Sequence, residues 1–203
     1  MKSNIVQVNF KVQHDWSKLI TIYKNIIDHW TNNKLHNQVY LKEINTYQYD
    51  LGVFGSLTVL DDITPQKKKG SASFLHGRIV ESNLPWIQQL QNDLSPINLS
   101  SVCIFNSNQN ITSHTDKSQI VDKQNEICKL NLFMTDSDSQ LHVENDGQVE
   151  SITAVTNQAW LLNVVNPHWA TIPQDLFLFQ LSFNKPFDQV VEWFKDKEFN
   201  YQS

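Results

Sequence analysis

Short alternating runs of apolar and polar residues dominate the chain between residues 101 and 184. Six runs there are rich in β-branched and aromatic residues, and clusters of Asn, Asp, Ser and Gly separate them: SVCIF, EICKLNLFM, SQLHVEN, GQVESITAV, QAWLLNVV and DLFLFQLSF. Several short strands at this spacing are typical of a β-sandwich or a β-barrel. The Asp146-Gly147 pair in ENDG supplies the positive φ angles that a tight hairpin turn needs, so it predicts a hairpin.

Helical patterns lie on both sides of this β-rich stretch. Asp15–Trp30 places apolar residues on one helical face behind an aspartate suited to N-capping. Residues 82–94 predict a helix entered through Pro85, and residues 186–199 predict a final helix. Residues 51–60 are typical of a strand.

The size of the chain suits one domain. With 203 residues, of which 40% are hydrophobic and 18% charged, it can bury one substantial core. We expect a mainly β protein with flanking helices, in which residues 1–100 support and cover the β core, residues 101–184 form it, and residues 185–203 form a C-terminal helix.

Composition excludes several classes of function. The net charge of −5 disfavours a nucleic-acid partner, because such partners require clustered Lys and Arg. The chain has no run near 18 apolar residues, and its first residues alternate with polar ones, so we expect a soluble cytoplasmic protein with no membrane partner. It should be a monomer or a homodimer. Cys103 and Cys128 have no nearby cysteine partners, which favours buried free thiols.

Candidate metal ligands occur at the ends of the predicted strands. His114 and Asp116 stand two residues apart after the run SVCIF, and this spacing turns both side chains to the same side of an extended chain. His168 directly follows the run QAWLLNVV. Two histidines and one carboxylate on one face form the facial triad that holds non-haem Fe(II) and leaves three coordination positions open. Zinc accepts the same ligands, and each residue taken singly also fits an ordinary turn or a half-buried histidine.

The order of these residues and the strands around them resemble a known family. Residues 101–183 are similar to the double-stranded β-helix of the Fe(II)/2-oxoglutarate-dependent dioxygenases through four segments: HTD at 114–116, CKLNLFM at 128–134, WLLNVVNPHWA at 160–170 and LFLFQLSF at 176–183. Within that family, these four segments look most like the aspartyl/asparaginyl β-hydroxylase and prolyl-hydroxylase-like branches. The resemblance implies a jelly-roll (cupin-like) core with His114, Asp116 and His168 as iron ligands. The carboxylate of Asp116 also argues against a halogenase, since halogenases lack it.

The chain departs from the family at the residue that anchors the co-substrate. Most members place an Arg or Lys about ten residues beyond the distal histidine, to pair with the far carboxylate of 2-oxoglutarate. No basic residue lies between His168 and Lys185, and a buried dicarboxylate without a cation would be costly. Some branches of the family use a cation on a strand that follows the H-x-D segment. Lys129, thirteen residues after Asp116, is therefore the candidate anchor, unless it lies on an edge strand and reaches solvent.

A polar face along two strands supports a cavity beside Lys129. Strand alternation puts Lys129 and Asn131 on one face, and Cys128, Leu130 and Leu132 on the other. In the last strand, Gln180 and Ser182 end a face that begins with Leu176 and Leu178. The candidate cofactor-binding residues are thus Lys129, Asn131, Gln180, Ser182 and Asn106.

The resemblance implies an oxidative function. The cofactors would be Fe(II), 2-oxoglutarate and O2, with 2-oxoglutarate converted to succinate and CO2 while a C–H bond of an amino-acid side chain, free or in a peptide, is hydroxylated. Arg78, Trp160 and Trp169 are the candidate contacts to this small-molecule or peptide substrate, although a lone loop Arg is more often a surface charge.

Two other interpretations stay open. A cupin-like metal-dependent enzyme that does not use 2-oxoglutarate fits the same ligands and the absent late cation. A non-catalytic β-sandwich binding module fits the strand pattern if His114 and Asp116 are loop residues.

Overall fold

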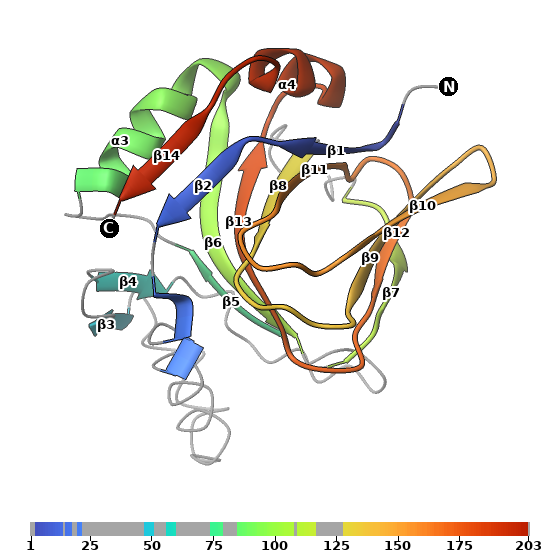
Figure 1. Ribbon diagram of the computed structural model, residues 1–203, viewed down its shortest axis with the longest axis horizontal. Coiled ribbons are helices and arrows are strands. Elements are labelled where there is room, and N and C mark those ends of the chain that lie inside the picture. The colour runs from blue at the N-terminus through green and yellow to red at the C-terminus, as the bar shows by residue number, and fades with distance from the viewer. Residues whose placement is uncertain are drawn as a thin grey trace, which may run out of the picture.

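Two facing β-sheets form the centre of the molecule (Figure 1). The structure is a computed structural model that describes residues 3–13, 15–17, 20–21, 47–50, 56–59, 74–78, 85–107, 109–116 and 128–202. The larger sheet has the order β1-β11-β8-β13-β6-β5 and consists of β1 (Ile5–Val8), β11 (Ala159–Asn163), β8 (Cys128–Phe133), β13 (Leu176–Phe183), β6 (Leu99–Ser107) and β5 (Phe74–Arg78). The smaller sheet has the order β10-β9-β12-β7 and consists of β10 (Gln148–Thr153), β9 (Gln140–Asn145), β12 (His168–Thr171) and β7 (Ile111–His114).

The remaining elements lie around these two sheets. They are β2 (Phe10–Gln13), β3 (Tyr47–Asp50), β4 (Ser56–Val59), α3 (Pro85–Leu94), the 3-10 turn η2 (Ser95–Ile97), α4 (Phe187–Phe194) and β14 (Phe199–Gln202). All neighbouring strands in both large sheets are antiparallel, and β14 pairs in parallel with β2. The predicted fold, a double-stranded β-helix with helices packed on it, is confirmed.

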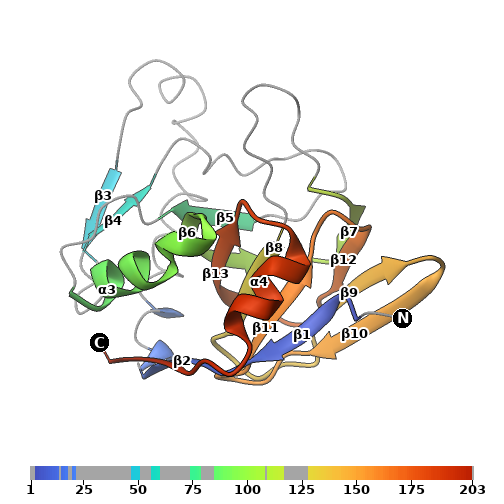
Figure 2. The same ribbon diagram turned by 90° about the horizontal axis from the view of Figure 1, so that it is seen from above.

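The alternation within β13 explains why the sheet is covered on both faces. Phe177, Phe179, Leu181 and Phe183 belong to a core formed with α3, α4, β2 and β14. Leu176 and Leu178 point the other way, into a second core between the two sheets. All eight residues of β13 are buried, as expected for a central strand between two layers. Figure 2 shows α3 and α4 on the side of the larger sheet that faces away from the smaller one.

Helices α3 and α4 begin as the sequence predicts. Helix α3 begins at Pro85, whose missing N–H costs nothing in the first turn, and it buries Trp86, Ile87, Leu90 and Leu94 against the sheet. The predicted helix over residues 186–199 is wrong beyond Phe194. There the chain leaves the helix and Phe199–Gln202 forms β14, because Tyr201 is buried against Phe10 at a ring distance of 5.5 Å.

Other predicted elements lie partly outside the described residues. Of the predicted helix Asp15–Trp30, only residues 15–17 and 20–21 are described, and residues 16, 17, 20 and 21 are helical. Of the predicted strand over residues 51–60, Ser56–Val59 is described and forms β4. Among the described residues, no helix is long and apolar enough to cross a membrane.

The predicted hairpin joins β9 to β10. Asp146 has φ of 50° and Gly147 has φ of 78°, so both central residues of the turn are left-handed, as the common two-residue hairpin turn requires. Asn145 pairs with Gln148 at the base of the turn. The hairpin prediction is therefore confirmed.

Candidate metal centre

Adjacent strands of the smaller sheet bring the two predicted histidine ligands together. His114 is the last residue of β7, His168 is the first residue of β12, and the two are directly paired in register. Their ring centroids lie 4.2 Å apart. Asp116 follows two residues later, and its backbone N–H donates to the carbonyl oxygen of Val164 at 3.0 Å. Sheet pairing thus brings together two residues that are 54 positions apart in sequence.

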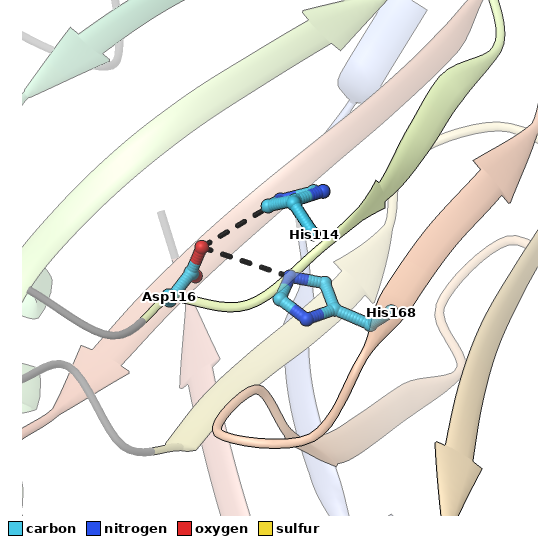
Figure 3. A group of neighbouring side chains, drawn as sticks. All are labelled: His114, Asp116 and His168. Atoms are coloured by element: carbon cyan, nitrogen blue, oxygen red, sulfur yellow. Dashed lines mark ion pairs between the residues drawn. The ribbon is translucent and has the colours of Figure 1, made fainter.

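The three side chains converge on one point (Figure 3). Oδ1 of Asp116 lies 3.6 Å from Nε2 of His114 and 3.7 Å from Nε2 of His168. All three candidate ligand atoms lie within 4.8 Å of one another. Metal–ligand bonds of about 2.0–2.2 Å place ligand atoms of one ion about 3–4 Å apart, so small side-chain adjustments suffice to bind a common ion.

Backbone carbonyls determine which nitrogen of each histidine is available. Nδ1 of His114 lies 2.8 Å from the carbonyl oxygen of Thr112, and Nδ1 of His168 lies 3.0 Å from that of Asn166. A carbonyl oxygen can only accept, so Nδ1 is the protonated nitrogen in both rings, and Nε2 is the nitrogen that can face a metal ion. Hydrogen bonds of this kind are the usual means of orienting metal-binding histidines.

The protonation states of the buried ligands suit a metal ion. Burial alone would raise the pKa of Asp116, but the Lys129 ammonium lowers it below its ordinary value. Burial lowers the pKa of His168, which favours the neutral imidazole. A charged carboxylate and a neutral imidazole are the forms that coordinate divalent metals.

Lys129 makes a contact that the sequence did not predict. Its Nζ atom lies 2.5 Å from Oδ2 of Asp116, and both side chains are largely buried, with 16% and 19% of their surface exposed. Asp116 therefore directs one oxygen toward the histidines and the other toward Lys129. The ammonium neutralises the carboxylate and holds its orientation.

The three candidate ligands line a cavity of about 250 Å³. Lys129, Asn131 and Gln180 form its polar side, and Nε2 of Gln180 donates to Oδ1 of Asn131 at 2.7 Å. The apolar side consists mainly of Phe105, Ile111, Leu141, Leu162, Val164 and Leu178. The opposite face of β8, with Cys128, Leu130 and Leu132, packs into the other core, so the predicted facing of this strand is confirmed.

The other predicted site residues are not all at this cavity. Trp169 lines it, and its ring stacks on His142 at 5.1 Å. Ser182 lies opposite Lys129 in register, and it is not part of the lining. Trp160 is also outside the lining, with its indole N–H donating to Gln158.

Asn106 and Arg78 complete the predicted set. The Asn106 amide donates to the carbonyl oxygen of Leu176 at 3.1 Å instead of facing the cavity. Asn106 is on the other face of β6 from Phe105, which does line the cavity, because successive strand residues alternate between faces. Arg78 ends β5 and pairs in register with Cys103, while its side chain is outside the described part of the structure.

The contributions of Thr112, Val164 and Asn166 to the site could not be recognised from the sequence. Each acts through a backbone carbonyl, and every residue type has one. The only local signal is the Asn-Pro pair before His168, which is typical of a turn.

Comparison with known proteins supports the fold. No protein-family model and no curated protein matches the chain. Among solved structures, a prolyl hydroxylase from Trichoplax adhaerens, in complex with a peptide fragment of a hypoxia-inducible factor degradation domain, has a TM-score of 0.50 and 11% identity, covering 96% of this chain and 88% of its own. A Pseudomonas putida prolyl-4-hydroxylase has a TM-score of 0.49 and 7% identity over 90% of this chain and 92% of its own. A non-haem α-ketoglutarate-dependent carbocyclase of nogalamycin biosynthesis has a TM-score of 0.43 and 7% identity over 89% and 79%. At these identities the likeness to the Trichoplax protein shows a shared fold.

Proposed function

We propose that this protein is a non-haem Fe(II)- and 2-oxoglutarate-dependent oxygenase that hydroxylates a C–H bond of an amino-acid side chain, free or in a peptide. One observation carries the proposal: His114, Asp116 and His168 direct two Nε2 atoms and one carboxylate oxygen at a common point. Two histidines and one carboxylate leave the positions that such oxygenases need for co-substrate and O2.

The protein's first task is to hold the ion with open positions. The three ligands come from β7, β12 and the residues after β7, so the paired strands keep them on one side of the ion. Lys129 holds Oδ2 of Asp116, which leaves Oδ1 as the ligand atom and disfavours bidentate coordination. Ferrous iron bound there would supply the activation of O2, driven by oxidation of 2-oxoglutarate, that attack on an unactivated C–H bond requires.

The cavity suits a small dicarboxylate. Its volume of about 250 Å³ is below the range of about 300–1,000 Å³ found for drug-sized ligands. The Lys129 ammonium has three N–H donors, so it can bind a co-substrate carboxylate while it keeps its contact with Asp116. Among the described residues that line the cavity, Lys129 is the one basic side chain other than histidine. It therefore takes the place of the cation that the chain lacks between His168 and Lys185.

The remaining lining residues would exclude water and orient the substrate. Apolar side chains such as Phe105, Leu141 and Leu178 line the same cavity as Lys129 and Asn131. His114 is the most exposed ligand, with 44% of its side chain accessible, so the substrate would approach from its side. The Trichoplax prolyl hydroxylase was determined with a peptide, which is consistent with a peptide substrate here.

Turnover of 2-oxoglutarate tests the proposal directly. The purified protein, with Fe(II), ascorbate and 2-oxoglutarate, should release succinate, and His114→Ala or Asp116→Ala should abolish this release. Tyr201→Phe is the matched control, because it removes a partly buried hydrogen bond to Asp93 at the other side of the larger sheet. Release of succinate that survives loss of His114 would contradict the proposed site.

The second candidate is a metal-dependent enzyme of the same fold that does not use 2-oxoglutarate. The ion pair between Lys129 and Asp116 favours it, since part of the donor capacity of Lys129 is already used. Under this candidate, Mn(II) would stabilise the wild-type protein and 2-oxoglutarate would add no further stabilisation. If His114→Ala left the Mn(II) effect unchanged, the protein would instead be a binding module without this metal site.

A further inference from the structure

We infer that Asn4 is a positioning residue for the metal centre, acting through the turn between β11 and β12. The inference rests on the proposed function, because it concerns how the metal ligands are held. Asn4 precedes β1, and only 6% of its surface is exposed.

The turn at residues 163–167 holds two of the three ligands. The Val164 carbonyl oxygen accepts the backbone N–H of Asp116 at 3.0 Å. The Asn166 carbonyl oxygen accepts Nδ1–H of His168 at 3.0 Å. A shift of this turn would therefore move the backbone of Asp116 and rotate the ring of His168.

Asn4 ties the two ends of this turn together. Its side-chain oxygen Oδ1 accepts Nδ2–H of Asn163 and Nδ2–H of Asn166, both at 3.0 Å. Its backbone oxygen also accepts the N–H of Asn163 at 3.0 Å. Within the turn itself, the bond from Asn166 N–H to the Asn163 carbonyl is long, at 3.4 Å. The turn thus depends on Asn4 for much of its geometry.

Glu150 in β10 fixes which way the Asn4 amide points. Its Oε1 accepts the backbone N–H of Asn4 at 2.8 Å and Nδ2–H of Asn4 at 3.3 Å. The hydroxyl of Ser3 donates to Oε2 of the same carboxylate. A carboxylate can only accept, so Nδ2 of Asn4 must face Glu150 and Oδ1 must face the turn. A chain of contacts therefore runs from Glu150 through Asn4 and Asn166 to His168.

These contacts from Glu150 to His168 are separate from the strand pairing that holds β1 in the sheet. Strand β1 is already held by pairing with β11, from Ile5 with Leu162 to Val8 with Ala159. The side chain of Asn4 is not part of that pairing, because it contacts the turn and Glu150. Loss of the side chain should therefore change metal binding while β1 stays paired with its neighbour.

The experiment measures the Mn(II) dissociation constant by EPR of free Mn(II), together with the unfolding temperature of each metal-free protein. Asn4→Leu keeps the volume and removes every side-chain hydrogen bond, so we expect about a tenfold weaker Mn(II) affinity, as found for outer partners of metal ligands. Asn4→Asp should weaken Mn(II) at least as much, because it sets a second carboxylate against Glu150.

A compensating change provides the rescue. In the double variant Asn4→Asp/Glu150→Gln, the introduced glutamine amide donates to the introduced carboxylate, which still accepts from both turn asparagines. Its Mn(II) affinity should be tighter than that of Asn4→Asp but weaker than that of the wild type, because the amide nitrogen in place of Oε1 cannot accept the backbone N–H of residue 4. Tyr201→Phe loses a partly buried hydrogen bond elsewhere, so it should lower stability without weakening Mn(II) binding.

If the wild-type protein binds Mn(II), three results would overturn the inference. The first is a folded Asn4→Leu protein that binds Mn(II) as tightly as the wild type. The second is equal Mn(II) affinity in Asn4→Asp and in the double variant. This second comparison carries the test if Asn4→Leu does not fold. The third is a Tyr201→Phe protein whose Mn(II) affinity is weakened as much as that of Asn4→Leu, because the effect would then follow from lower overall stability. If the wild-type protein itself does not bind Mn(II), the proposed function falls and the inference falls with it.

Discussion

Replacement of Lys129 by methionine would remove the cation from the buried pair with Asp116 and keep the length of the side chain. The two charged atoms lie 2.5 Å apart, and their side chains are 16% and 19% exposed. Removal of one partner of a buried pair costs about 3–5 kcal/mol, because the remaining charge stays buried and uncompensated. Since both groups keep some contact with water, we expect about 3 kcal/mol. For a chain of this size that lowers the unfolding temperature by about 6–12 °C.

A metal ion should reverse most of this loss. Mn(II) bound beside Asp116 supplies the positive charge that the variant lacks, so the rise in unfolding temperature on adding Mn(II) should be larger in Lys129→Met than in the wild type. Addition of 2-oxoglutarate should then raise the unfolding temperature of the wild type further and leave the unfolding temperature of Lys129→Met unchanged.

Thermal unfolding by circular dichroism in EDTA, in Mn(II), and in Mn(II) with 2-oxoglutarate measures all three effects. Lys195→Met is the matched control, because Lys195 pairs with Glu192 at 3.7 Å with both side chains mostly exposed. Such surface pairs contribute about 0–1 kcal/mol. If metal-free Lys129→Met unfolds within about 2 °C of this control, or gains no more from Mn(II) than the wild type, the reasoning is refuted.

Three further predictions concern other parts of the molecule. Gln180→Ala removes the donor to Asn131 in the cavity, so it should raise the KM for 2-oxoglutarate and leave the Mn(II) dissociation constant unchanged. A weaker Mn(II) affinity would instead place Gln180 at the metal. A Cβ atom at Gly147 would meet no atom within 4 Å, but the residue has φ of 78°. Gly147→Ala should therefore lower the free energy of unfolding in denaturant by about 1 kcal/mol through backbone strain alone. No loss would mean that the turn relaxes. Burial, with Asp93 nearby, raises the pKa of Tyr201, so the contribution of Tyr201 to stability is complete below the unfolded pKa of about 10 and is lost as pH rises further. In unfolding experiments, Tyr201→Phe should therefore flatten the fall in stability at alkaline pH. An unchanged slope would contradict this prediction.

Local pattern was sufficient to predict which way many side chains face. The alternation in Cys128–Phe133 and Leu176–Phe183 separated the residues of the cavity from those of the outer core, and the structure confirms both faces. A strand has a period of two residues, so the polarity of neighbouring residues determines its two faces. The hairpin at Asp146-Gly147 was predictable for a similar reason, since its backbone angles are a property of those two residues.

Partners far away in sequence decided the features that the pattern did not predict. The sequence prediction extended the last helix to residue 199, but the chain leaves the helix after Phe194 because β14 pairs with β2, nearly the whole length of the chain away. Trp160 and Asn106 have residue types suited to a binding site, but their positions in the sheets leave them outside the cavity lining.

By itself, the sequence determined the class of the fold, the facing of the central strands and the three residue types suited to a metal ion. Only the tertiary structure decided that β7 pairs with β12, so that His114 meets His168, and that Lys129 reaches Asp116. The physical reason is that periodicity and turn chemistry act between near neighbours in the chain. Strand register and buried charge pairs, in contrast, depend on the packing of the whole core.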